Sequence, residues 1–183
     1  MAKPFIWIAL LGSVAISLVG CISIARYDGP YAGRIIDAET SQPLEGVVVF
    51  GEWKVFHPNL AGGNYTYYDA TEARTDKNGE FLIPGKGVRV MSNLTEMYFL
   101  IFKAGYEAVH PVPWKALKNM TTTNNVRFEG NKAIIPIRKL SLDEMKKRIR
   151  PGISNLAPIQ KQKLLTLELD KEGKELGYDL YNK

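Results

Sequence analysis

The chain has little of the chemistry that disulfide scaffolds, cysteine-based metal sites and histidine-based catalysts require. Its 183 residues include one cysteine, Cys21, and two histidines, His57 and His110. A single cysteine excludes an intramolecular disulfide and any zinc site built on two or more cysteines. Each histidine lies beside a proline in an expected loop, neither is placed as a general base, and no Gly-x-Ser-x-Gly motif occurs. We therefore predict no catalytic residues, no metal site and no enzymatic activity.

A strong excess of charge of one sign is also absent. The chain has 24 Lys and Arg against 19 Asp and Glu, a formal net charge of +5. Nucleic-acid-binding domains usually carry a dense basic patch. Here many of the lysines lie in the last third of the chain and alternate with glutamates, as on a solvated helix face. The sequence therefore predicts no nucleic-acid partner.

Long hydrophobic runs are missing except at the N-terminus. Lys3 precedes an apolar stretch over residues 5–19. This stretch is shorter than the roughly 20 residues that a membrane-spanning helix needs. It has the length of the apolar region of a secretory signal peptide, about 7–15 residues. We expect residues 1–20 to be a signal peptide, and the alternative is an uncleaved anchor helix.

The apolar stretch ends on Leu18-Val19-Gly20-Cys21. This segment resembles the lipobox of bacterial lipoproteins. The resemblance implies cleavage before Cys21, a diacylglyceryl thioether on its sulfur and an acyl chain on the new amino terminus, and no other cofactor. Two or more acyl chains hold a protein stably at a membrane, whereas one chain holds it only marginally. In a Gram-negative cell, Ile22 after the cysteine would favour the outer membrane, so the cell envelope is the expected location.

From Tyr31 onward, short segments with β-sheet patterning alternate with turn signals. Residues 21–30 are expected to be a lipidated tether and residues 31–140 the β domain. Residues 46–56 include an apolar, β-branched run typical of a strand buried on both faces. Asn78-Gly79 is a strong hairpin signal, and residues 57–70 and 111–131 are expected to be irregular. Pro136 favours an edge position for the last strand. About seven strands at near-regular spacing predict a mainly β chain built as a β-sandwich.

Four segments of this region share the pattern of one family. They are residues 33–37, 43–49, 75–84 and 103–106, in that order along the chain. Together they resemble the carboxypeptidase regulatory-like domain, a transthyretin-like (prealbumin-type) sandwich of seven strands. The resemblance implies a stalk or binding module that is not itself catalytic. Fold alone does not assign a function, so the resemblance is an expectation about architecture first.

After Leu140 the pattern becomes helical, and residues 141–183 are expected to form an extension with two helices. Ser141 and Glu144 have the spacing of a capping box, which predicts a helix start. A second helix is expected from about Pro158, with Gly177 as its stop. Its apolar residues form a broad face, which either packs on the β domain or docks on a partner.

Four aromatic residues are the candidate binding residues. Tyr65, Tyr67 and Tyr68 lie in the expected 57–70 loop, and Trp114 lies in the second irregular segment. Exposed aromatic side chains suit recognition loops because they bury a large area at a small entropic cost. The primary hypothesis is a lipid-anchored structural or interaction module that binds another envelope protein. The alternative is a small-ligand or glycan-binding protein that uses the 57–70 loop.

Overall fold

The computed structural model describes residues 25–119 and 125–178. The expected signal peptide, the lipobox and Cys21 lie outside these residues. The strands of the described part are β1 (Ala25–Asp28), β2 (Tyr31–Asp37), β3 (Val48–His57), β4 (Asn64–Arg74), β5 (Glu80–Ile83), β6 (Gly87–Val90), β7 (Tyr98–Phe102), β8 (Val109–Pro113), β9 (Arg127–Glu129) and β10 (Lys132–Ile137). Its helices are α2 (Ala116–Asn119), α3 (Leu142–Lys147), the short 3-10 helix η1 (Ile159–Lys161) and α4 (Lys163–Glu175).

The prediction of a mainly β chain followed by helices is confirmed. The count of seven strands is not, because the described residues contain ten. Strands β1 and β6 were not predicted, whereas a strand at residues 126–128, close to β9, was. Segments that were expected to be irregular also contain regular structure. Part of the expected 21–30 tether forms β1, most of the 57–70 loop belongs to β3 and β4, and the 111–131 segment contributes the end of β8, helix α2 and β9.

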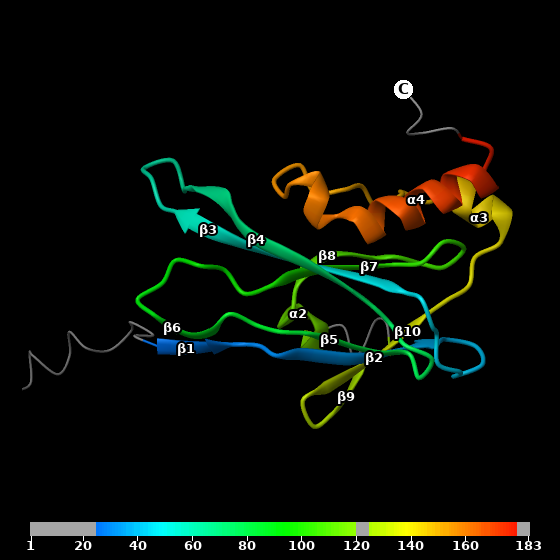
Figure 1. Ribbon diagram of the computed structural model, residues 1–183, viewed down its shortest axis with the longest axis horizontal. Coiled ribbons are helices and arrows are strands. Elements are labelled where there is room, and N and C mark those ends of the chain that lie inside the picture. Colours follow the sequence, from blue (N-terminus) through cyan, green and yellow to red (C-terminus); the bar gives the residue numbers. More distant parts are fainter. Residues whose placement is uncertain (1–24, 120–124, 179–183) are drawn as a thin grey trace, which may run out of the picture.

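Two four-stranded sheets and one two-stranded ribbon organise the strands. The first sheet has the order β5-β2-β10-β9, the second has the order β4-β3-β7-β8, and β1 pairs with β6. Strand β10 runs parallel to β2, and the other paired neighbours are antiparallel. Figure 1 shows the second sheet between the first sheet and helices α3 and α4. The described part is therefore layered, with the helices on the outer side of one sheet.

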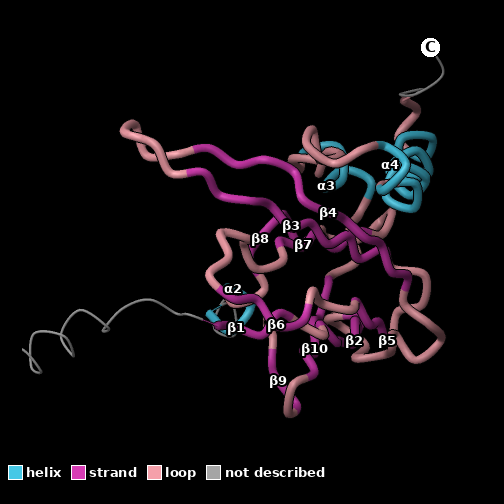
Figure 2. Tube along the Cα trace, turned by 60° about the vertical axis from the view of Figure 1, so that its left-hand side comes forward, coloured by secondary structure: helices cyan, strands magenta, loops and turns pink. Residues whose placement is uncertain are grey.

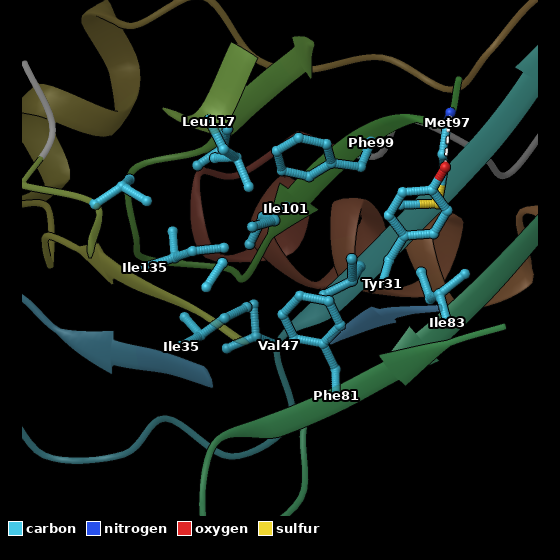
Figure 3. Close-up of a cluster of buried hydrophobic side chains, with 14 of the residues drawn as sticks. Tyr31, Ile35, Val47, Phe81, Ile83, Met97, Phe99, Ile101, Leu117 and Ile135 are labelled. Atoms are coloured by element: carbon cyan, nitrogen blue, oxygen red, sulfur yellow. Dashed lines mark hydrogen bonds between the residues drawn. The ribbon is translucent and has the colours of Figure 1, made fainter. Parts of the chain in front are cut away.

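Both four-stranded sheets contribute to one apolar core. Strand β3 supplies Val49 and Trp53, and strand β2 supplies Ile35. Figure 3 shows Ile35 and Ile135 from the first sheet facing Val47, Phe99 and Ile101 from the second-sheet side of the core. Alternate residues of a strand point to opposite faces, so this core takes every second side chain of β3.

The other face of β3 belongs to a second core under helix α4. Val48 and Phe50 pack there with Leu165 and Leu169. The two leucines are four residues apart, which places them on one face of the helix. The expectation that this strand is buried on both faces is confirmed, and the apolar face of the second helix packs on the chain's own sheet.

Polar contacts from other elements hold the ends of the helices. Helix α3 begins with the predicted capping box, in which Ser141 and Glu144 satisfy each other's backbone N–H groups. Helix α4 has no side-chain cap of its own. Instead, the Glu72 carboxylate of β4 accepts the backbone N–H groups of Leu164 at 3.0 Å and Leu165 at 2.7 Å. A negative charge at this position also complements the helix dipole. Gly177, at φ 78°, ends the helix as expected.

The Asn78-Gly79 turn is not a hairpin between paired strands. Strand β4 before it belongs to the second sheet, and strand β5 after it belongs to the first. The Asp76 carboxylate accepts the backbone N–H groups of Asn78 and Glu80 at 2.9 and 2.8 Å, which tightens the turn. Gly79 has φ +73°, and a Cβ there would lie 2.4 Å from the carbonyl oxygen of Ile35. The turn residues were correctly identified, but they connect the two sheets.

The position of Pro136 also differs from the expectation. Strand β10 lies between β2 and β9 and is not at the edge of its sheet. However, β9 pairs only with residues 132–134 of β10, and Pro136 lies beyond that pairing. The missing N–H of proline therefore leaves no pairing partner unsatisfied on that side.

Candidate functional site

The expected 57–70 loop is a projecting hairpin. Strands β3 and β4 remain paired as far as His57 and Asn64, with an irregularity in register between Trp53 and Lys54. We call residues 54–67 of this hairpin the arm. Figure 2 shows the arm extending away from both sheets. The loop interpretation is wrong because backbone pairing continues through most of the segment, and only residues 58–63 connect the strands.

Side-chain contacts stiffen the arm and its tip. The ring of Tyr65 lies 5.2 Å from that of Phe56, centroid to centroid. His57 Nε2 lies 2.8 Å from the Thr66 hydroxyl oxygen across the hairpin. In the connection, the Asn59 side-chain oxygen accepts two backbone N–H groups, those of residues 61 and 63. The arm is therefore an ordered β element.

The three predicted tyrosines do not form one surface. Tyr65 is 49% exposed near the tip, beside the fully exposed Leu60. Tyr67 is partly buried against the core under α4. Tyr68 follows it at the register irregularity, and the guanidinium carbon of Arg89 lies 5.6 Å from the centre of its ring. Of these predicted residues, only Tyr65 belongs to the projecting tip.

Trp114 is partly buried and packs against the main core. Its ring packs 5.2 Å from that of Tyr31 and 5.3 Å from that of Phe99, both in edge-to-face geometry. Trp114 also lines a cavity of about 420 Å³ beside strands β1 and β2. Cavities of roughly 300–1,000 Å³ are typical of small-molecule sites. The cavity wall also includes Arg26, Asp28 and Glu96.

Asp28 is the most densely bonded polar residue of this wall. Its side chain is almost fully buried and accepts the Tyr31 hydroxyl, the Trp53 indole N–H at 2.9 Å and the Lys86 backbone N–H at 2.8 Å. Burial raises the pKa of Tyr31, and the hydrogen bond to Asp28 raises it further. The phenol therefore stays protonated and donates to the carboxylate. The hydrogen bonds of Asp28 therefore attach the end of β1 to the main core.

Two lysines, Lys86 and Lys161, connect the cluster around Asp28 to Asp69 of the second sheet and to the segment before α4. The Lys86 ammonium lies 4.3 Å from the centre of the Trp53 ring and forms an ion pair with Asp69. Asp69 also pairs with Lys161 at 3.0 Å. Burial acts to raise the pKa of Asp69, but hydrogen bonds from both lysines lower it to about 2 overall. The carboxylate thus links the β5–β6 segment, the base of the arm and η1.

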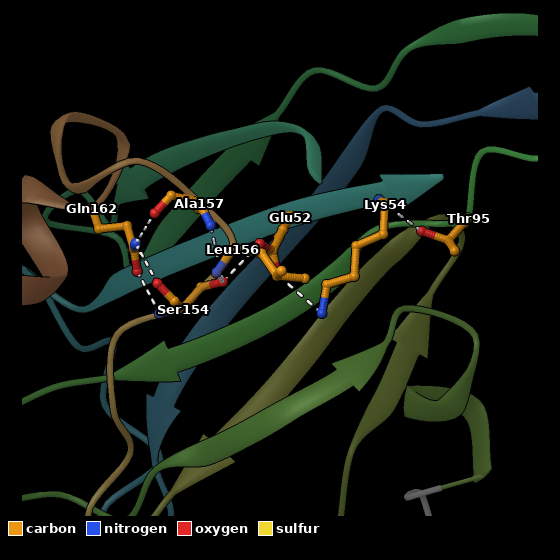
Figure 4. A network of polar contacts seen from close by, with 7 residues as sticks. All are labelled: Glu52, Lys54, Thr95, Ser154, Leu156, Ala157 and Gln162. Atoms are coloured by element: carbon orange, nitrogen blue, oxygen red, sulfur yellow. Dashed lines mark hydrogen bonds and ion pairs between the residues drawn. The ribbon is translucent and has the colours of Figure 1, made fainter. Parts of the chain in front are cut away.

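A second polar network attaches the segment before α4 to β3 (Figure 4). The Ser154 hydroxyl donates to the Glu52 carboxylate at 2.7 Å, and Lys54 pairs with that carboxylate at 3.1 Å. The same hydroxyl oxygen accepts backbone N–H groups of residues 156 and 157. Gln162, which is fully buried, accepts from the Ser154 N–H and donates to the carbonyl oxygens of Ser154 and Ala157. Ser154 therefore connects the segment before α4 to strand β3.

Sequence reasoning missed the residues of these networks. Glu52 and Glu72 have no local motif, because Ser154 and Leu165, to which they bond, lie far away in the sequence. Gln162 bonds to Ser154 and Ala157, which are near in sequence, but these contacts match no motif that sequence reasoning used. Asp28 carried a weak signal, since it directly precedes Gly29-Pro30, but it was assigned to the tether. Only contacts between distant segments distinguish these residues from ordinary solvated side chains.

Two searches of the described residues bear on cofactors and membranes. Within residues 25–119 and 125–178, no group of three His, Cys, Asp or Glu side chains gathers closely enough to hold a metal ion. Over the same ranges, no helix is both long and apolar enough to cross a bilayer.

No protein-family model matches the chain. No curated protein matches it either. Among solved structures, it is similar to 3-chlorocatechol 1,2-dioxygenase from Rhodococcus opacus 1CP, with 15% sequence identity, a TM-score of 0.33 and 62% coverage of each chain.

This comparison corrects one prediction. The matched structure is that of an enzyme, which contradicts the prediction that the present chain is not one, and that prediction is withdrawn. A TM-score of 0.33 carries no argument for the same fold or the same reaction in this chain. The chain spans 62% of the matched structure.

Proposed function

We propose that this chain is a lipid-anchored envelope protein whose arm binds another protein close to the membrane. The anchor is supported by Leu18-Val19-Gly20-Cys21 at the end of the N-terminal apolar stretch. The outer membrane of a Gram-negative cell is the proposed location, since Ile22 follows the cysteine. The observation that carries the binding role is the ordered, projecting arm with exposed apolar residues at its tip.

The proposed architecture is a transthyretin-like sandwich of the carboxypeptidase regulatory-like type. Its support is the pair of four-stranded sheets that share one core. The order of the four matching sequence segments is a second, independent support. In such a scaffold, a rigid sandwich positions projecting elements for recognition.

The arm is suited to a protein partner for two physical reasons. Leu60 is fully exposed and Tyr65 is half exposed over Phe56, so the tip offers apolar area that is already ordered. Ordered aromatic side chains lose little entropy on binding, which favours affinity. Strand β4 is also at the edge of its sheet, so its outer backbone groups can pair with a strand of a partner.

The arm also points towards the expected membrane side. Figures 1 and 2 both place its tip at the same end of the molecule as β1, the first described strand. Only three residues separate the start of β1 at Ala25 from Cys21. A partner of the arm would therefore be embedded in the membrane or lie at its surface.

Site-specific photocrosslinking in intact cells tests the binding role. We expect a photoreactive residue at Leu60 to give a discrete crosslinked protein that the same residue at Leu167 does not give. Leu167 is a matched control because it is also an exposed leucine, but lies on α4. Equal crosslinking patterns at the two positions would contradict the arm as the binding element.

The anchor has its own test. Cys21→Ala should leave an unprocessed or soluble protein, whereas the parent chain should fractionate with the membrane. A Cys21→Ala protein that still reaches the membrane fraction in the processed form would refute the lipid anchor.

A second candidate function is small-ligand or glycan binding. The 57–70 segment supports it poorly, since Tyr65, Tyr67 and Tyr68 face different surroundings. The cavity of about 420 Å³ beside Trp114 supports it better, because aromatic and charged side chains converge there. Trp114→Ala should then abolish any ligand-induced rise in melting temperature, while Tyr65→Ala should leave it unchanged. The opposite pattern would exclude the cavity as the site.

A further inference from the structure

The β1–β6 ribbon exposes an apolar face next to the N-terminal end of the described chain. Ala25 pairs with Val90 and Tyr27 pairs with Val88, so these four residues lie on the same face of the ribbon. Tyr27 is 69% exposed, Val88 68% and Val90 60%. We call this set, together with Met91, the ribbon face. Cross-strand neighbours are close in space, so the exposed side chains form a contiguous patch.

Met91, which directly follows Val90 at the end of β6, is a further exposed apolar residue. It is 78% exposed and has φ 44°, a backbone conformation that bulky residues rarely adopt. No packing in the described part of the chain explains why an apolar side chain is held outward at this position. Contiguous exposed apolar surface on a folded domain usually marks a contact with a partner or a membrane.

The opposite face of the ribbon carries two arginines. Arg26 and Arg89 are direct cross-strand partners, and like charges in this arrangement repel. Nε and one terminal nitrogen of Arg26, and Nε of Arg89, are buried without a hydrogen-bond partner among the described residues. The one acidic residue of the ribbon, Asp28, is engaged by Tyr31, Trp53 and Lys86. The two guanidinium groups therefore lie on the side of the ribbon away from its apolar face and add no charge to that face.

We propose that the ribbon face lies on the phospholipid surface and orients the domain against the membrane. This inference rests on the proposed lipid anchor at Cys21. The connection from Cys21 to Ala25 can extend at most about 14 Å over its four steps, from 3.3–3.6 Å per residue. A lipid on Cys21 thus keeps the ribbon within that distance of the headgroups, so the exposed side chains meet the membrane at little further entropic cost.

The side chains of the ribbon face suit the interfacial layer of a bilayer. Tyrosine favours the headgroup level, where its ring is shielded and its hydroxyl stays hydrated. Val88, Val90 and Met91 can enter the adjoining acyl region, as the apolar face of an interfacial element does. A lipid surface is the occupant that the short connection to Cys21 brings to this face.

Lipid-borne quenching of a site-specific fluorophore tests the proposal on the full lipidated protein. Val88→Cys, and Val90→Cys as a second variant, each introduce one thiol besides Cys21. The control is Leu167→Cys on α4, which is similarly exposed at 61%. Each variant is labelled, reconstituted in vesicles of phosphatidylethanolamine and phosphatidylglycerol, and compared with vesicles that contain brominated phospholipid. We expect loss of most of the emission at positions 88 and 90 and no loss at position 167.

The outcomes separate the ribbon from the anchor. Emission at 88 and 90 that resists brominated lipid, while the protein stays vesicle-bound, overturns the ribbon proposal and leaves the anchor intact. Emission at 88 and 90 that neither brominated lipid nor aqueous iodide quenches indicates that protein, such as a second copy, covers the ribbon face. That result also overturns the ribbon proposal. A Cys21 thiol of the parent protein that reacts with maleimide after denaturation refutes the anchor, and with it the reason for a lipid occupant.

Discussion

Replacement of Asp28 by alanine tests whether the first described strand is an integral part of the domain. Asp28 is only 4% exposed, and its carboxylate accepts hydrogen bonds from Tyr31, Trp53 and Lys86. Alanine would leave the Trp53 indole N–H and the Tyr31 hydroxyl without this acceptor. Both donors belong to side chains of the main core, where water has little access.

The size of the effect follows from these two donors. A buried donor without a partner costs about 1–3 kcal/mol, so two donors cost about 2–6 kcal/mol. Removing the carboxylate also removes its own desolvation penalty, which lowers the net loss to about 2–4 kcal/mol. The Lys86 N–H adds little, because Lys86 is only partly buried and water can replace the lost acceptor. Against a typical domain stability of about 5–15 kcal/mol, this loss is large.

Urea unfolding of the parent chain and of Asp28→Ala measures the effect. With a slope of about 2 kcal/mol per molar urea, the middle of the usual range, the midpoint should fall by about 1–2 M. Asp28→Asn is the matched control, because it keeps one acceptor oxygen and should lose less. A loss below about 1 kcal/mol for Asp28→Ala would refute the reasoning and indicate that water in the adjoining cavity replaces the carboxylate.

Three further predictions concern the helix cap, a turn and acid stability. Glu72→Gln should destabilise the chain by about 0.5–2 kcal/mol in urea, since α4 loses its charged cap; no change would mean that the cap is not needed. Gly79→Ala should lower the melting temperature more than Gly87→Ala, because both glycines have positive φ but only position 79 lacks room for a Cβ; equal losses would contradict this. The pKa of Asp69 lies at about 2 instead of 3.8, so its stabilising contribution is present above pH 4 and is lost between pH 4 and pH 2. Asp69→Asn should weaken the dependence of the urea unfolding midpoint on pH between pH 4 and pH 2. The same pH dependence in the variant and the parent chain would exclude the Asp69 carboxylate as a cause of acid destabilisation.

Local signals in the sequence predicted local structure well. The capping box at Ser141, the helix stop at Gly177 and the turn residues Asn78-Gly79 all appear at their expected positions. Each depends on backbone conformation or on contacts between neighbouring residues, which the sequence specifies directly. The burial of both faces of β3 was also predictable, because an uninterrupted apolar, β-branched run puts apolar side chains on both faces of the strand.

Pairing between distant segments was not predictable in the same way. The Asn78-Gly79 turn looks the same whether it joins paired strands or crosses between sheets, and only the pairing of β5 with β2 decides. The arm was taken for a loop because glycine and asparagine near residues 62–64 obscure the strands beside them. Trp114 was assigned to a binding surface because exposure has no sequence signal of its own, and its contacts with Tyr31 and Phe99 are long-range.

The position of β3 between two cores has a consequence for export and folding. Val48 and Phe50 reach their helical neighbours Leu165 and Leu169 only after more than a hundred further residues have been made. A chain that crosses a membrane from its N-terminus would therefore carry an uncovered apolar sheet face until α4 arrives. Such long-range contacts slow folding and expose intermediates to aggregation. On the proposed route of export, an escort would have to protect β3 and β7 until the last helix has emerged.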